Sequence, residues 1–293
     1  MKIAIIGANG YIGHNLIERL LAETNHNIVA LSTTVESMIY KHERLTKHNV
    51  DVFDTEMLHE YLKNCDVAYY LIHMMSQKKI DFAKAESIAA KSFCRAVNNS
   101  NIKRVIYLGG LGNDKDKLSK HLASRHKTGE IMRNRLTQLI EFRASMVIGD
   151  GSISYDIVTN LIHKLPILTL PKWAKTLTQP IGLNDTITYL IEALSLKTTE
   201  NQIIEIGGPE QLSYGDLMKR YATWRNKKMI IIKLHVIPVS IAALWLNLFT
   251  PKNHAKVGRI MVDSLSNPMI VTNNKAKELF PNIHPKDLEE VFV

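Results

Sequence analysis

Short apolar runs alternate with amphipathic stretches through the first half of the chain. The runs have the length of buried parallel strands, and the stretches repeat apolar residues at the spacing of a helix that covers a sheet. This alternation predicts an α/β fold with a parallel sheet and helices on both faces. The predicted strands are Lys2–Ile6, Ile28–Leu31, Asn49–Val52, Val67–Ile72, Arg104–Leu108 and Gln138–Phe142, and the predicted helices are Tyr11–Ala22, Glu56–Asn64, Asp81–Asn98 and Ser119–Asn134.

A glycine-rich turn joins the first predicted strand to the first predicted helix. Gly7, Gly10 and Gly13 follow the spacing G-x-x-G-x-x-G. In such a turn the first glycine allows a tight bend, the second lets a phosphate approach the backbone, and the third brings helix and strand together. The free N–H groups and the positive end of the helix dipole then face the phosphate. The predicted dinucleotide-binding residues of this turn are Gly7, Asn9, Gly10, Tyr11, Ile12 and Gly13.

The pattern loosens after Gly151, which indicates a smaller second lobe. We expect residues 1–152 to form a nucleotide-binding domain to which residues 176–206 return. Residues 153–175 and 207–293 are expected to form a lobe that binds a substrate or a partner. Further helices are predicted at Ser154–Lys164, Thr186–Leu196 and Tyr214–Asn226, and a further strand at Ile203–Ile206.

The most apolar stretch of the chain is Val236–Phe249. It is too short to span a bilayer, which takes about 20 apolar residues. A buried or pocket-lining helix is one interpretation. A helix that lies on a membrane surface or on a partner protein is the other, because Trp245, Lys252 and Lys256 suit an interface.

Composition and charge narrow the range of partners. The 293 residues carry a formal net charge of +9. The basic residues are interspersed with acids and lack the interleaved aromatic residues of a single-strand binder, so nucleic acid is not expected as a partner. A basic surface also suits a phosphorylated cofactor or an anionic substrate. Cys65 and Cys94 have no metal-ligand or disulfide spacing, so we expect no metal site and a cytoplasmic location.

Five segments together resemble a known family. Their order and residues are similar to those of atypical short-chain dehydrogenase/reductases of the NmrA-like type, also called nucleoside-diphosphate-sugar epimerase-like NAD(P)-binding proteins. The resemblance spans roughly the whole chain and is most specific in its first half. It implies a Rossmann-type, doubly wound parallel sheet that binds NAD(P), with a smaller, mostly C-terminal second lobe. The segments are Gly7–Gly13, Tyr70–Met75, Tyr107–Leu111, Phe142–Gly149 and Gly207–Ser213.

The choice between NAD and NADP depends on the end of the second strand. An acid there accepts hydrogen bonds from the ribose of NAD, whereas an arginine pairs with the 2′-phosphate of NADP. This chain has Ser32, Thr33 and Thr34, which do not repel a phosphate and can donate to it. NADP is therefore expected in preference to NAD, and an ordinary polar loop is the alternative interpretation. Three basic residues that follow can add positive charge: Lys41, His42 and Arg44.

The carboxyl ends of the other strands supply further cofactor-binding candidates. The resemblance places Asp54 near the adenine, and Asp54 also suits the N-cap of the following helix. Ile72, His73 and Met74 follow the fourth strand, where the nicotinamide is expected. Methionine can line an apolar pocket there, and core packing is the alternative. Gly109 ends the fifth strand.

The resemblance breaks at the catalytic residues. Active family members use Tyr-x-x-x-Lys on the helix after the fifth strand and a serine at that strand's end. Here these positions hold His121 and Arg125, and the serine position falls on Gly109 or Gly110. His121 can act as an acid or base, although a cationic Arg125 disfavours its protonated form, and Arg125 can donate to the nicotinamide ribose. A solvated basic helix face is the alternative for both residues.

Three functions are therefore considered. The first is an NADP-preferring, NAD(P)-binding protein that lacks the usual Ser/Tyr/Lys set and acts as a redox-cofactor sensor or binding module. The second is an NAD(P)-dependent reductase or epimerase in which His121 acts on a small apolar carbonyl or sugar-like substrate. The third is an assembly or interaction factor at a membrane surface, which uses Val236–Phe249. At the end of the sixth strand, Arg143 is expected either to pair with Asp150 or to contact an anionic substrate.

Overall fold

A parallel sheet of seven strands organises the first lobe. The computed structural model describes residues 1–38, 40–75, 80–164, 167–170, 172–228, 230–233 and 263–292. The strand order is β11-β6-β5-β4-β1-β2-β3, and all neighbouring strands run parallel, which confirms the predicted doubly wound α/β fold. The strands are β1 (Lys2–Ile6), β2 (Asn27–Ser32), β3 (Leu45–Asn49), β4 (Val67–Tyr70), β5 (Arg104–Gly110), β6 (Leu139–Ala144) and β11 (Gln202–Ile206).

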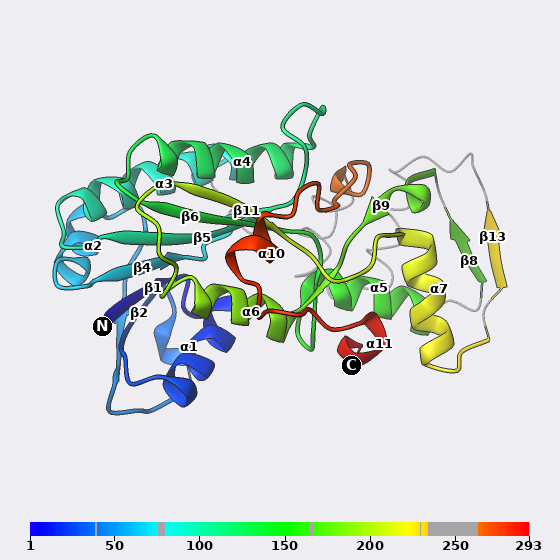
Figure 1. Ribbon diagram of the computed structural model, residues 1–293, viewed down its shortest axis with the longest axis horizontal. Coiled ribbons are helices and arrows are strands. Elements are labelled where there is room, and N and C mark those ends of the chain that lie inside the picture. Colours follow the sequence, from blue (N-terminus) through cyan, green and yellow to red (C-terminus); the bar gives the residue numbers. More distant parts are fainter. Residues whose placement is uncertain are drawn as a thin grey trace.

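Helices cover both faces of this sheet (Figure 1). On one face α1 (Tyr11–Glu23) packs beside α6 (Leu183–Glu192). The other face carries α2 (Thr55–Leu62), α3 (Phe82–Asn98) and α4 (Lys120–Arg133). Strand β1 shows why the pattern is apolar throughout: Ile3 and Ile5 belong to the core under α1, and Ala4 and Ile6 to the core under α2 and α3. Both faces of the strand are buried, as expected for a parallel sheet covered on both sides.

One predicted strand is wrong. The third strand is Leu45–Asn49, whereas the apolar pattern predicted Asn49–Val52. β3 is the edge strand of the sheet and is only partly buried, so its residues carry no apolar run. Val50 and Val52 are buried beyond the end of the strand, and the Val50 amide still donates to Ser32 O at 2.9 Å. The apolar residues therefore lie in the segment that follows β3 and not in the strand itself.

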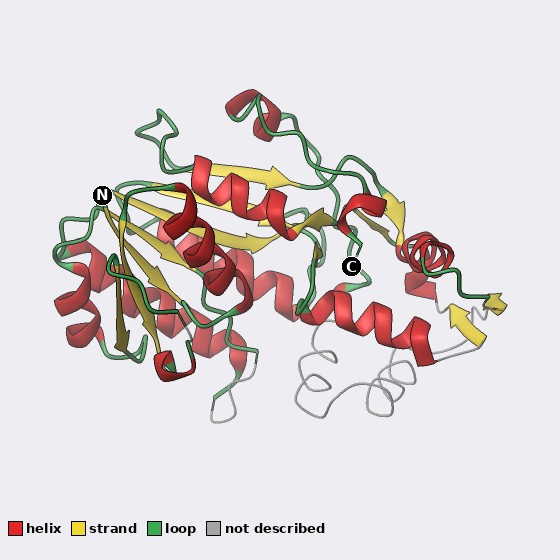
Figure 2. Cartoon of the chain, turned by 90° about the horizontal axis from the view of Figure 1, so that it is seen from below, coloured by secondary structure: helices red, strands yellow, loops and turns green. Residues whose placement is uncertain are grey.

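The second lobe lies beyond the carboxyl ends of the strands (Figures 1 and 2). Its core contains Tyr155, Trp173, Tyr214, Tyr221 and Phe292. Ser213 caps α7 by accepting a hydrogen bond from the Asp216 amide, as predicted. The lobe's elements are β7 (Val147–Ile148), α5 (Ile153–Lys164), β8 (Ile167–Leu170), η2 (Lys172–Lys175), β9 (Leu177–Thr178), β10 (Ile181–Gly182), β12 (Leu212–Ser213), α7 (Tyr214–Trp224), β13 (Ile230–Lys233) and α11 (Leu288–Val291).

The chain crosses between the lobes more than once. β11 pairs with β6 and so returns to the main sheet. Near the C-terminus, α10 (Lys275–Leu279) contacts β11, and Ala276 and Phe280 join the core under α1 and α6. The assignment of residues 207–293 to the second lobe and the boundary at residue 152 stay predictions. Val236–Phe249 lies outside the described residues, and no helix within the described ranges is long and apolar enough to cross a membrane.

Candidate functional site

The sheet reverses its direction of growth between β1 and β4. From β1 the chain adds β2 and β3 on one side, and then β4, β5 and β6 on the other. Ligands of open α/β sheets bind outside the carboxyl ends of the strands at this point. The glycine turn after β1 and residues Leu71–Met75 after β4 both lie there, and the Leu71 amide donates to Ile6 O at 2.8 Å.

The glycine turn has the shape that a pyrophosphate requires. Gly7 adopts φ +89°, and a Cβ there would lie 2.9 Å from the Leu71 carbonyl, while a Cβ on Gly13 would overlap the Gly7 carbonyl oxygen. Gly10 has more space around it than Gly7 and Gly13, because a Cβ there would meet only Gly7 O, at 3.1 Å. Gly10 is also the N-cap of α1, and no described side chain bonds to that helix end. The first amides of α1 are therefore not capped by a side chain, as a phosphate-binding helix N-terminus requires.

Tyr11 and Ile12 open α1 and reach toward different parts of the molecule. Ile12 packs against the core under α1. The Tyr11 hydroxyl is buried without a hydrogen-bond partner among the described residues, and a Cβ on Gly149 would overlap it. Burial, together with Asp150 and Asp156, raises the pKa of Tyr11 to about 12. This phenol is therefore neutral, and its hydroxyl is an unused donor at the start of α1.

Asn9 fixes the loop after β2. Its Nδ2 donates to Thr34 Oγ1 at 3.0 Å and to Ser37 Oγ at 2.9 Å. Ser37 belongs to the short 3-10 turn η1 (Val35–Ser37), which follows Ser32, Thr33 and Thr34. The loop that should hold the adenosine ribose is thus tied directly to the glycine turn.

Two further predictions at this end of the sheet have different outcomes. Asp54 caps α2 as predicted, because its Oδ1 accepts from the Met57 amide at 3.0 Å. Arg44 is not available to a 2′-phosphate, since its guanidinium binds the carbonyl oxygens of Leu21 and Thr24 at the end of α1. Arginine near a helix C-terminus satisfies carbonyls that lack partners and complements the dipole, so Arg44 closes α1.

A chain of polar side chains runs across the other half of the site. His73 Nε2 lies 2.9 Å from His121 Nε2, and His121 Nδ1 lies 2.9 Å from Ser264 Oγ. Ser264 Oγ in turn lies 2.9 Å from Ser119 Oγ, at the N-cap of α4. His73 Nδ1 faces Glu86 Oε1 at 3.6 Å. The arrangement joins the loop after β4, the start of α4 and the C-terminal part of the chain.

Arg125 is a buried clamp and not part of a solvated helix face. It is 6% exposed, and its guanidinium donates to Ile72 O at 2.8 Å and to Leu108 O. It therefore joins the carboxyl ends of β4 and β5. The guanidinium also lies 3.6 Å from the buried Glu86 carboxylate and 4.9 Å from the centre of the Tyr107 ring. Both terminal nitrogens are already engaged within the protein.

The remaining predicted residues near the nicotinamide position are mostly packed. The side chains of Ile72 and Met74 contact the core under α2 and α3, which favours the packing interpretation. The Met74 amide donates to Glu86 Oε1 at 3.3 Å. Gly109 pairs with Arg143 in the sheet, and a Cβ there would lie 3.1 Å from the Tyr107 ring. Arg143 itself pairs with Glu141 and Asp114 and not with the predicted Asp150.

The two histidines are held in the neutral form. Burial and the charge of Arg125 lower the pKa of His121 to about 4, as expected from the sequence for a histidine beside this cation. Burial, Arg125 and His121 lower the pKa of His73 well below its ordinary value. Neutral imidazoles can exchange hydrogen bonds with each other and with Ser264, whereas two imidazolium rings would repel.

This neutral state predicts a pH dependence of stability. Below pH 6.5 the unfolded chain takes up a proton at His121 that the folded chain does not take up until about pH 4. The free energy of unfolding therefore decreases as the pH is lowered from 6.5 to 4. We expect His121→Asn to flatten this fall by up to about 1.4 kcal/mol per pH unit near pH 5. Urea unfolding at several pH values measures the slope, with His284→Asn at an exposed histidine as the control. Equal slopes for wild type and His121→Asn would contradict the neutral assignment.

Glu86 and Ser264 belong to this group of polar side chains, but they were not predicted as site residues from the sequence. Glu86 is 2% exposed and accepts from Ser124 Oγ at 2.5 Å. A signal existed for it, because Glu86, Ala89, Ala90 and Phe93 fall on one face at helical spacing, which places a carboxylate in an apolar stripe. No local signal points to Ser264, which reaches His121 from 143 residues away. Among the residues that the structure describes, no group of His, Cys, Asp or Glu is arranged to hold a metal.

Comparison with known proteins agrees with this geometry. Residues 7–146 match the model of a family described as NAD(P)H-binding. The fold resembles that of the triphenylmethane reductase of Citrobacter sp. complexed with NADP(H), with a TM-score of 0.79, 14% identity, and coverage of 99% of this chain and 98% of that chain. A nucleoside-diphosphate-sugar epimerase from Staphylococcus aureus matches with a TM-score of 0.77 and 14% identity, over 99% of this chain and 98% of that chain. A dTDP-glucose 4,6-dehydratase from Streptomyces venezuelae with NAD bound matches with a TM-score of 0.73 and 14% identity, over 99% of this chain and 94% of that chain.

A search of curated protein sequences finds no match to the chain. The structural matches cover both lobes, whereas the family model covers the first lobe up to the beginning of the second. Residues 7–146 thus match a family described as NAD(P)H-binding, and the whole chain shares its fold with these epimerase and reductase structures, in agreement with the resemblance to NmrA-like, atypical short-chain dehydrogenase/reductase proteins.

Proposed function

We propose that this protein binds NADP(H) in preference to NAD(H) and acts as a redox-cofactor sensor or binding module. One observation carries the proposal. The glycine turn is free of side chains at Gly10, whereas His121 and Arg125, at the usual tyrosine and lysine positions on α4, are both bound to other parts of the protein. The cofactor supplies a hydride when it is bound. The described residues supply a binding surface without the usual proton donor.

The preference for NADP(H) is supported by the loop after β2. Ser32, Thr33 and Thr34 place three hydroxyl groups and no carboxylate at the strand end. The nearby Glu36 carboxylate accepts a hydrogen bond from Asn49, which lies at the end of β3. Hydroxyl donors without a competing acid favour a ribose that carries a 2′-phosphate. With Arg44 occupied at α1, Lys41 and His42 are left as the predicted sources of charge.

The absence of the usual proton chemistry is supported by the contacts of α4. A tyrosine in the position of His121 would need a free hydroxyl and a nearby cation to lower its pKa. His121 instead has both nitrogens within hydrogen-bond distance of His73 and Ser264, and it is neutral. Gly109 and Gly110 offer no side chain at the serine position. We therefore expect NADPH to be bound and simple aldehydes and ketones not to be reduced.

The substitution Gly10→Ala tests the cofactor site. The backbone at Gly10 is extended (φ −74°, ψ 162°), so alanine can adopt it, and the new Cβ would meet only Gly7 O. The methyl group would occupy the space where a pyrophosphate approaches, and we expect affinity for NADPH to fall at least about tenfold, or about 1.4 kcal/mol. Fluorescence titration measures the affinity, and an unchanged thermal unfolding midpoint shows that the fold is retained. An unchanged affinity would place the nucleotide elsewhere.

A reductase or epimerase that uses His121 is the second candidate. The observation that favours it is the hydrogen-bond chain through His73, His121 and Ser264, which can relay a proton. Steady oxidation of NADPH in the presence of a carbonyl panel, lost in His121→Phe, would favour this function over the binding module. The membrane-surface function, the cytoplasmic location and the identity of any partner stay predictions.

A further inference from the structure

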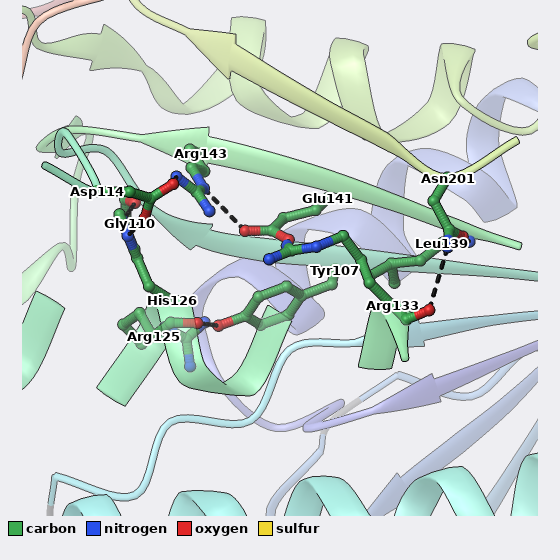
Figure 3. Close-up of polar contacts among 10 residues, drawn as sticks. All are labelled: Tyr107, Gly110, Asp114, Arg125, His126, Arg133, Leu139, Glu141, Arg143 and Asn201. Carbon is green, nitrogen blue, oxygen red and sulfur yellow. Dashed lines mark hydrogen bonds and ion pairs between the residues drawn. The ribbon is translucent and has the colours of Figure 1, made fainter. Parts of the chain in front are cut away.

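Charged side chains are buried between β6 and α4 (Figure 3). Glu141 is fully buried and Arg143 is 3% exposed, although both lie on an inner strand of the sheet. Arg143 Nε donates to Glu141 Oε1 at 2.8 Å, and Arg133 pairs with the other carboxylate oxygen. Gly129 on α4 makes room for this carboxylate, because a Cβ there would overlap it. Burying charged side chains costs desolvation free energy, which only well-placed partners can offset.

His126 on α4 belongs to the same group. Its Nδ1 lies 2.5 Å from Asp114 Oδ1, and its Nε2 lies 3.0 Å from Gly110 O. A carboxylate and a carbonyl oxygen only accept hydrogen bonds, so the imidazole takes part in these contacts as a donor. Arg133, Arg143 and His126 thus lie around the Glu141 and Asp114 carboxylates.

One donor in this group is unused. Arg143 Nη2 is buried and has no hydrogen-bond partner within the described part of the chain. Arg143 Nη1 donates to Asp114 Oδ2 at 3.0 Å. Asp114 is the exposed member of the pair, since its side chain is 63% exposed against 4% for Arg143 and 9% for His126. The Asp114 carboxylate therefore lies between solvent and two buried donors.

The position of this group separates it from the dinucleotide phosphates. Arg143 pairs with Gly109 near the carboxyl ends of β5 and β6. In the sheet order, β6 lies three strands from β1 and its glycine turn, which corresponds to about 14 Å. Gly110, which accepts from His126, ends β5, close to where the nicotinamide is expected. An anion bound here would belong to a second ligand.

We propose that Arg143 and His126 form a binding site for a carboxylate or phosphate group of a small-molecule ligand, and that Asp114 occupies this site until the ligand displaces it. The planar guanidinium and the ring N–H match the oxygens of such a group, as they match those of Asp114. Arg143 Nη2 is a further donor that Asp114 does not use, so a ligand oxygen that bonds to it would gain a contact that Asp114 lacks. The Arg143 guanidinium favours an anion over a neutral ligand.

The substitution Asp114→Ala tests the site without any dinucleotide. It removes the internal competitor and leaves the buried donors in place. We expect calorimetric titration with sodium acetate and with inorganic phosphate, at constant ionic strength, to show at least tenfold tighter binding of one of them to Asp114→Ala than to wild type. The matched control is Glu60→Ala, which removes an exposed carboxylate paired with Lys63 and should behave as wild type. Tighter binding of acetate identifies a carboxylate ligand, and tighter binding of phosphate identifies a phosphorylated one.

Thermal unfolding of Asp114→Ala is the second measurement, and it keeps the test valid if the variant is less stable than wild type. Asp114→Ala leaves two buried donors without an acceptor, so its thermal unfolding midpoint should fall, and acetate or phosphate should restore it where sodium chloride does not. Equal anion affinities in wild type, Asp114→Ala and Glu60→Ala, with no restoration, would overturn the proposal and leave the group as an internal ion network. Because NADPH is absent, this result would not affect the proposed cofactor site.

Discussion

Replacement of Arg125 by methionine is expected to lower the free energy of unfolding by about 3–5 kcal/mol. Arg125 donates to the carbonyl oxygens of Ile72 and Leu108, and it is the cation beside the buried Glu86 carboxylate. Methionine fills much of the same space but supplies neither donors nor charge. The carbonyls at the ends of β4 and β5 would lose their partner, and a buried carboxylate would lose its counter-charge. Urea unfolding followed by circular dichroism measures the loss.

Two further variants separate charge from geometry. Arg125→Lys keeps the charge but cannot bridge two carbonyls with a planar fork, so we expect an intermediate loss. Glu86→Gln in the Arg125→Met background removes the unpaired carboxylate and should recover part of the loss, which a double-mutant cycle would reveal as coupling. A loss below about 1 kcal/mol in Arg125→Met would mean that the clamp is not structural, and Arg125 would return as a candidate for ribose binding.

The second large effect is expected at Gly129. In an exposed helix, replacing glycine by alanine stabilises by about 1 kcal/mol. Gly129 lies within α4, but its Cα faces the Glu141 carboxylate so closely that a methyl group would overlap it. Glu141 is fully buried and is held by Arg133 and Arg143, so it cannot move without breaking those ion pairs. We therefore expect Gly129→Ala to destabilise the protein by about 2–3 kcal/mol.

The same substitution in a Glu141→Ala background is its control. With the carboxylate gone, the helix propensity of alanine should dominate, and Gly129→Ala should become neutral or stabilising there. Equilibrium unfolding of the four proteins gives the coupling free energy. A stabilising effect of Gly129→Ala in the wild-type background would show that Glu141 does not lie against α4 as described.

The fold was largely readable from the sequence because its strands are buried on both faces. Ile3–Ile6 is apolar throughout, and this pattern cannot be produced by an exposed strand. Strand β3, at one edge of the sheet, was misplaced for the opposite reason, since Thr46 is exposed and Lys47 is only partly buried. Periodicity reports burial, so it locates inner strands better than edge strands.

The site was readable where one local segment builds it. The glycine turn is contained in seven residues, and its spacing alone predicted its shape. His121 and Arg125 were found by position, but whether they were solvated depended on Ser264, Glu86 and Ile72, which lie far away in the sequence. Arg44 was misassigned because proximity along the chain does not show which carbonyls a side chain reaches.

Calorimetric titration of the purified wild-type protein with NADPH and with NADH tests the central claim, that the glycine turn and the loop after β2 bind NADP(H). We expect both nucleotides to bind with one-to-one stoichiometry and NADPH to bind more tightly, because Ser32, Thr33 and Thr34 place hydroxyl donors and no carboxylate at the end of β2. No binding of either nucleotide to a folded protein would contradict the account.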